Sequence, residues 1–139
     1  MGHIYLIRHG QASFGADDYD KLRPLGHQQS ERLGQYLAQR SQRMGLTWDA
    51  VLTGSLRRHE ETWAGLAKGA GWALTPTVWP GLNEYDSEAV VRAIHPGELI
   101  HPQTPEAVRQ HFRLLREGLL SWMAGRSAPA GMPSHADFV

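Results

Sequence analysis

Hydrophobic and polar positions along the 139-residue chain alternate between short apolar runs and longer segments with helical spacing. The run Ile4-Tyr5-Leu6-Ile7 is rich in β-branched and aromatic residues, which predicts a short buried strand. Residues 48–53 predict a second strand for the same reason. Because strands alternate with helical segments, the pattern favours an α/β protein with a parallel sheet.

Apolar residues at helical spacing predict the helices, and capping residues mark their ends. Gly45 fits the end of the first helix, and Ser55 is a plausible N-cap for the second. Ser134 could cap a short last helix. The longer predicted helices cover about residues 27–44, about 56–70 and, in two parts, about 86–124.

Composition restricts the classes of function. Lysine plus arginine and aspartate plus glutamate each number 14, so the balanced charge argues against nucleic acid as a partner. The chain has no cysteine, which excludes disulfides and thiolate catalysis, and no histidine-rich metal-ligand spacing. No apolar run is long enough to span a membrane, and no secretory leader is visible, so we expect a cytoplasmic protein without a membrane partner.

The segment Arg8-His9-Gly10-Gln11 directly follows the first predicted strand. Ligands of open α/β sheets bind at the carboxyl ends of strands. A neutral imidazole is a good nucleophile, a guanidinium fits the oxygens of a phosphate, and a glycine lets a ligand approach the backbone. These residue types together predict phosphoryl transfer through a phosphohistidine.

This segment resembles the signature of the histidine phosphatase superfamily, which includes the cofactor-dependent phosphoglycerate mutases. Residues 55–62 resemble the superfamily's Ser-x-x-Arg-x-x-x-Thr element, in which Arg58 matches the second phosphate-binding arginine and Thr62 the threonine. A helix N-terminus favours an anion, which agrees with this role. The alternative is an exposed helix start with an incidental arginine pair.

Other parts of the site follow from the same resemblance. Glu84 matches the segment that supplies the proton donor, with Asp86 as a weaker candidate and a surface glutamate as the alternative reading. Gln11 and Ser13, with Gly10, are expected to contact the phosphate. Residues 19–26 fit the superfamily's approach to its first long helix, and we interpret them as structural.

The resemblance implies an α/β three-layer sandwich with a mostly parallel central sheet, like that of phosphoglycerate mutase. Residues 1–139 would form a single domain with a helical insert at about 86–125. A late strand with a second histidine is missing, because Ser134-His135 follows a Gly/Pro loop and precedes no glycine. We therefore expect that the native protein continues past Val139. The alternatives are that a second copy supplies the missing edge in a homodimer, or that the product is truncated and inactive.

The activity implied is hydrolysis of a phosphomonoester. His9 and Glu84 would be catalytic, and Arg8 and Arg58 would bind the phosphate without a metal or other cofactor. The partner would be a small phosphorylated substrate or a phosphate ion. Two alternatives remain: a phosphoglycerate mutase, and a phospho-ligand binding protein without turnover. The residues after the signature, Ala12 to Gly15, differ from the mutase pattern and favour a phosphatase.

Overall fold

The computed structural model describes residues 2–13, 18–97 and 102–139. They divide into two compact units, Met1–Asn83 and Glu84–Val139, and each unit is described by itself. The helical insert expected at about 86–125 belongs to the second unit, and the organisation as a single domain stays a prediction.

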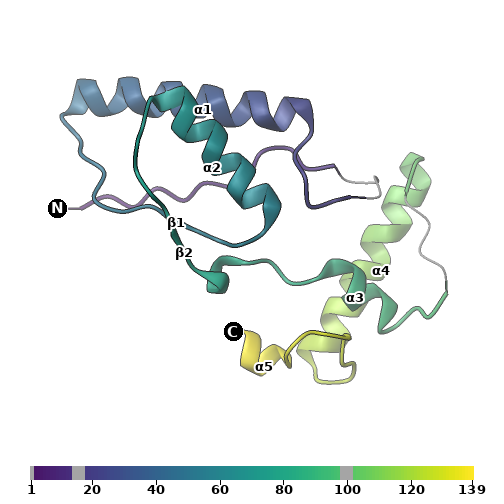
Figure 1. The fold of residues 1–139 in the computed structure, drawn as a ribbon. Coiled ribbons are helices and arrows are strands. Elements are labelled where there is room, and N and C mark those ends of the chain that lie inside the picture. Colours follow the sequence, from purple (N-terminus) through teal and green to yellow (C-terminus); the bar gives the residue numbers. More distant parts are fainter. Residues whose placement is uncertain (1, 14–17, 98–101) are drawn as a thin grey trace. The chain divides into compact units, whose positions relative to one another are not determined.

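Two helices dominate the first unit (Figure 1). Helix α1 (Pro24–Met44) begins three residues earlier than expected, because the fixed φ of Pro24 suits the first helical position. It ends at Gly45, whose φ of 61° is left-handed, as the sequence predicts. Helix α2 (Arg57–Ala70) confirms the second predicted helix.

Glycines let these two helices approach closely. A β-carbon on Gly34 of α1 would collide with the carbonyl group of Leu66 in α2. In the same way, a β-carbon on Gly69 of α2 would collide with the carbonyl group of Glu31 in α1. The backbones therefore meet where side chains would otherwise separate them, which fixes the second half of α2 relative to α1.

The first unit also contains a parallel pair of short strands, which makes the chain an α/β protein. Strand β1 (Leu52–Thr53) pairs with β2 (Thr77–Val78), with Leu52 opposite Thr77. The amide of Thr77 donates to the carbonyl of Val51 at 2.8 Å, and that of Trp79 to Thr53 at 2.7 Å. Only the last two residues of the predicted segment 48–53 form the strand, and a three-layer sandwich stays a prediction. A short 3-10 helix, η1 (Pro80–Leu82), follows β2.

The predicted buried strand at residues 4–7 is wrong. These residues form no strand with any other described part of the chain. Ile4 and Leu6 are 90% and 94% exposed, whereas Tyr5 between them packs on Trp48 with ring centroids 5.0 Å apart. Ile7 is exposed as well, so Tyr5 alone of these four residues is partly covered, and no neighbouring described strand pairs with the backbone.

The second unit is helical. Helix α3 (Ser87–Arg92) contributes the fully buried Val90 and Val91. Helix α4 (Pro105–Met123) is capped by Thr104, whose hydroxyl accepts from the amide of Ala107. Helix α5 (His135–Phe138) is capped by Ser134, as the sequence predicts. Buried Trp122 of α4 holds the unit together through ring contacts with Tyr85, His135 and Phe138.

Candidate functional site

The residues after His9 are fixed by backbone pairing with the segment before α1. The amide of Ser13 donates to the carbonyl of Lys21 at 3.0 Å, and the amide of Arg23 donates to Gln11 at 2.8 Å. The amide of Gln11 also donates to Oε1 of Gln29 at 3.0 Å. The predicted phosphate ligands Gln11 and Ser13 thus lie in an ordered segment at the start of α1, with Gln11 exposed and Ser13 buried.

Gly10 has a structural reason to be glycine besides access for a ligand. A β-carbon on Gly10 would meet the backbone of Gly26 in α1, and a β-carbon on Gly26 would collide with the backbone of Gln11. The two glycines therefore let the segment that follows His9 lie directly on the first turn of α1.

The ring of His9 is oriented by its own neighbour. Its Nδ1 lies 2.7 Å from the carbonyl oxygen of Gly10. A carbonyl oxygen only accepts hydrogen bonds, so Nδ1 carries the proton and donates. In the neutral ring this leaves the lone pair on Nε2. Nε2, which is buried, is therefore the ring nitrogen that carries the lone pair.

Thr62 of α2 joins the segment of His9 to the helix of Arg58. The buried amide of Gly10 donates to Oγ1 of Thr62 at 3.0 Å. The same hydroxyl donates to the carbonyl of Arg58 at 2.7 Å. The threonine of the motif at residues 55–62 is thus a physical link between the two parts of the predicted site.

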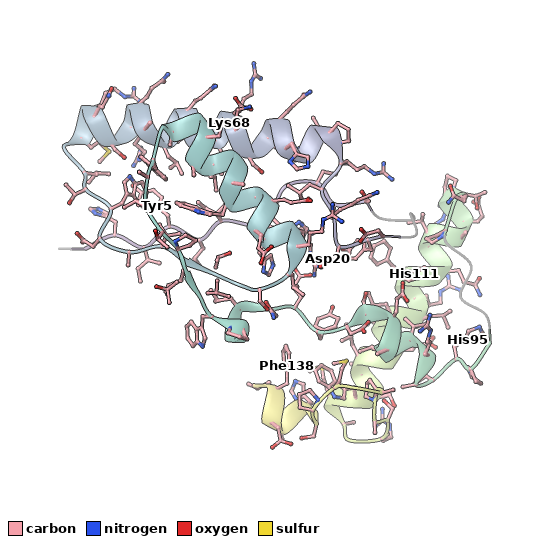
Figure 2. The ribbon with its side chains drawn as sticks, viewed as in Figure 1. Tyr5, Asp20, Lys68, His95, His111 and Phe138 are labelled. Carbon is pink, nitrogen blue, oxygen red and sulfur yellow. The ribbon has the colours of Figure 1, made fainter. Side chains whose placement is uncertain are left out.

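The guanidinium of Arg58 is buried, with its side chain only 7% exposed. Its Nη1 donates to Oδ1 of Asp20 at 2.8 Å, and its Cζ lies 5.3 Å from the centre of the Tyr19 ring. Figure 2 shows Asp20 beside the first turn of α2. A buried charge is tolerated when a counter-charge and hydrogen bonds compensate for the lost water, and Asp20 supplies both.

Asp20, not the predicted Ser55, caps α2. Its Oδ2 accepts from the amide of Arg57 at 3.0 Å, and its Oδ1 accepts from the amide of Arg58 at 3.4 Å. Ser55 instead pairs with Asn83: its amide donates to Oδ1 of Asn83, and its Oγ accepts from Nδ2 of Asn83, both at 2.8 Å. The amides expected to meet a phosphate therefore already bind the carboxylate of Asp20, as does Nη1 of Arg58.

Glu61 ties α2 to the segment before α1. Its carboxylate accepts from the amide of Leu22 at 2.7 Å and from Nε of Arg57 at 2.8 Å. Burial acts to raise the pKa of Glu61, but these two hydrogen bonds and the charge of Arg57 outweigh it. The pKa of Glu61 therefore lies below its ordinary value. Arg57 is exposed and also pairs with Asp18 at 2.9 Å. Arg57 therefore helps to attach the segment before α1 to α2.

Arg8 and His9 both line a hollow of about 120 Å³. Arg58 does not line this hollow, because its guanidinium points to Asp20. Glu84 is the first residue of the second unit and is exposed. The residues around the hollow are Arg8, His9, Gly10, Gln29, Ser30, Leu33 and Thr62.

Two further properties concern the described part of the chain. Within residues 2–13, 18–97 and 102–139, no three histidine, aspartate or glutamate side chains lie together as a metal site. Among the same residues, no helix combines the length and the apolar character needed to cross a bilayer.

The fold and the site define an α/β protein in which an Arg-His-Gly segment is tied to an arginine-bearing helix start. The family model of the histidine phosphatase superfamily (branch 1) matches residues 4–118, and the chain belongs to this superfamily. Membership supports phosphoryl transfer as the general chemistry, since the superfamily consists generally of phosphatases and mutases. Comparison with curated proteins and with solved structures gives no match.

Proposed function

We propose that the chain hydrolyses small phosphomonoesters through a phosphohistidine on His9. One observation carries this proposal: the hydroxyl of Thr62 binds both the amide of Gly10 and the carbonyl of Arg58. The nucleophile's neighbour and the turn that bears the second arginine are therefore joined through one side chain. Family membership supplies the phosphoryl chemistry that such an arrangement serves.

In the first step, the lone pair on Nε2 of His9 attacks the phosphorus and forms an N–P bond. The P–O bond to the alcohol breaks, and Glu84 gives its proton to the departing oxygen. Arg8 and Arg58 stabilise the charge on the three equatorial oxygens. The proton on Nδ1 stays in its hydrogen bond to Gly10, which keeps the ring in place.

In the second step, water attacks the phosphorus and the N–P bond breaks, which releases inorganic phosphate. Glu84, now ionised, accepts the proton of the attacking water, so that the resting state is restored. Gly10, Gln11 and Ser13 are the further phosphate contacts that we propose, because they follow His9 in the same ordered segment.

Hydrolysis of p-nitrophenyl phosphate by the purified chain, with and without EDTA, tests the proposal. We expect turnover in both conditions, its loss in His9→Ala, and wild-type turnover in His3→Ala. His3 is an exposed histidine of the same segment and is a matched control. Full turnover in His9→Ala would contradict the assignment of the nucleophile.

Two other results of this test would indicate different functions. A wild-type chain that binds phosphate but does not turn over would be a phospho-ligand binding protein. Transfer between the positions of a phosphoglycerate, dependent on a bisphosphate, would indicate a mutase. Either result would contradict hydrolysis as the reaction.

A further inference from the structure

We propose that Asp20, together with the ring of Tyr19, is a positioning residue that sets the guanidinium of Arg58 for phosphate. The inference rests on the proposed function, because it concerns the arginine to which that function assigns the phosphate. It gives a specific role to two residues that precede α1 and that the sequence places only in a structural segment.

The carboxylate of Asp20 binds three donors of a single helical turn. It accepts from the backbone amides of Arg57 and Arg58 and from Nη1 of the Arg58 side chain. The two amides fix the carboxylate relative to the helix, and the third bond fixes the guanidinium relative to the carboxylate. Because a guanidinium is planar and rigid, a bond that fixes Nη1 also fixes the direction of the whole group.

The ring of Tyr19 restricts the movement of the same guanidinium. The centre of its ring lies 5.3 Å from Cζ of Arg58, within the distance at which a cation is attracted to an aromatic face. The carboxylate thus constrains an edge of the guanidinium, and the ring constrains its plane. Two adjacent residues therefore limit both the translation and the rotation of one buried side chain.

Asp20 is itself held by the segment around it. Two residues earlier, Asp18 pairs with Arg57 at 2.9 Å, and two residues later, the amide of Leu22 donates to Glu61 at 2.7 Å. The segment is thus attached to α2 on both sides of Asp20. A side chain that is positioned in advance loses less conformational freedom when a ligand binds, which strengthens binding.

A carboxylate beside the phosphate could instead compete with it for Arg58. Burial argues for positioning: the Asp20 side chain is 39% exposed, so water screens its charge, whereas Arg58 is only 7% exposed. A buried guanidinium without its carboxylate would lose the compensation for its missing water and would move toward solvent. Removal of Asp20 should therefore weaken phosphate binding, whereas under competition it should strengthen it.

Calorimetric titration of the full chain with inorganic phosphate tests the sign of this effect. We expect Asp20→Ala to raise the Kd for phosphate by about tenfold, which corresponds to about 1.4 kcal/mol. Asp20→Asn keeps an acceptor for Nη1 and should restore part of the affinity. Asp18→Ala removes an acidic side chain of the same segment that contacts Arg57 but not Arg58, and should leave Kd within about twofold.

The KM for p-nitrophenyl phosphate should rise with Kd in Asp20→Ala, which a loss of helix stability alone would not produce in a folded variant. If Asp20→Ala does not fold, Tyr19→Leu replaces it, and a raised Kd in that variant supports the inference. An unchanged or lowered Kd in the folded variant overturns it. A wild-type chain that binds no phosphate would contradict the proposed function itself, and the inference with it.

Discussion

The hydroxyl of Thr62 accepts a hydrogen bond from the amide of Gly10 at 3.0 Å, across 52 positions of the chain. The same hydroxyl donates to the carbonyl of Arg58, so it binds backbone groups of both parts of the predicted site. One small polar side chain therefore links the His9 segment directly to the first turn of α2.

Replacement of Thr62 by valine should destabilise the chain. Valine has a similar shape but no hydroxyl, so the buried amide of Gly10 would lose its acceptor, at a cost of about 1–3 kcal/mol. Urea denaturation measures this loss. Thr62→Ser keeps the hydroxyl and is the control, and a Thr62→Val chain as stable as wild type would show that the bond is unimportant.

Gly34→Ala should also destabilise the chain, although alanine is the better helix former by about 1 kcal/mol. The new methyl group would collide with the carbonyl of Leu66, and it would lie 3.0 Å from the amide nitrogen of Ala70. Overpacking of this kind costs about 1–3 kcal/mol. Thermal or urea unfolding tests this, with exposed Gln35→Ala as a control. A stabilised Gly34→Ala chain would refute the close contact of α1 and α2.

Glu61 should make stability depend on pH. Its pKa is lowered in the folded chain, so its contribution is fully present above the ordinary carboxyl pKa of about 4.3. That contribution is lost as the pH falls through the lowered folded-state pKa. The free energy of unfolding should therefore differ between wild type and Glu61→Gln at neutral pH, and this difference should shrink in acid. The exposed neighbour Glu60→Gln is the control, and a pH-independent difference would disagree with this reasoning.

Glu84→Gln should slow hydrolysis according to the leaving group. An alkyl alcohol needs a proton to depart, whereas p-nitrophenolate leaves readily without one, and general acid catalysis contributes about a hundredfold or more. The kcat for an alkyl phosphate should therefore fall much more than that for p-nitrophenyl phosphate. Glu88→Gln is the matched control, because Glu88 is exposed and pairs with Arg92. Equal losses for both esters would argue against Glu84 as the proton donor.

The sequence predicted the parts of the fold that depend on local interactions. Gly45 ends α1 and Ser134 starts α5 as expected, because caps act within one helical turn. The strand at residues 4–7 was predicted wrongly, because a strand needs partners that its own residues do not specify. Ser55 fails as a cap for a similar reason. Asp20, which caps α2 by accepting from the amide of Arg57, lies 37 positions from Arg57 in the chain.

The site was predictable in its residue types but not in its connections. Arg8 and His9 do share a hollow, and their adjacency in the sequence suffices for that. Thr62 was identified only as a motif position, and no spacing rule would indicate that it binds Gly10. The contact of Asp20 with Arg58 likewise arises from tertiary packing, and an acidic residue after a tyrosine is by itself a weak signal.

The central claim is that His9 carries the phosphoryl group, and trapping this intermediate tests it most directly. The chain would be mixed with p-nitrophenyl phosphate, quenched in alkali, in which phosphohistidine survives, and analysed by peptide mass spectrometry. We predict a phosphoryl group on the peptide that contains His9, at that residue, and none in His9→Ala. A phosphoryl group on a different residue during turnover, or turnover by His9→Ala, would contradict the account.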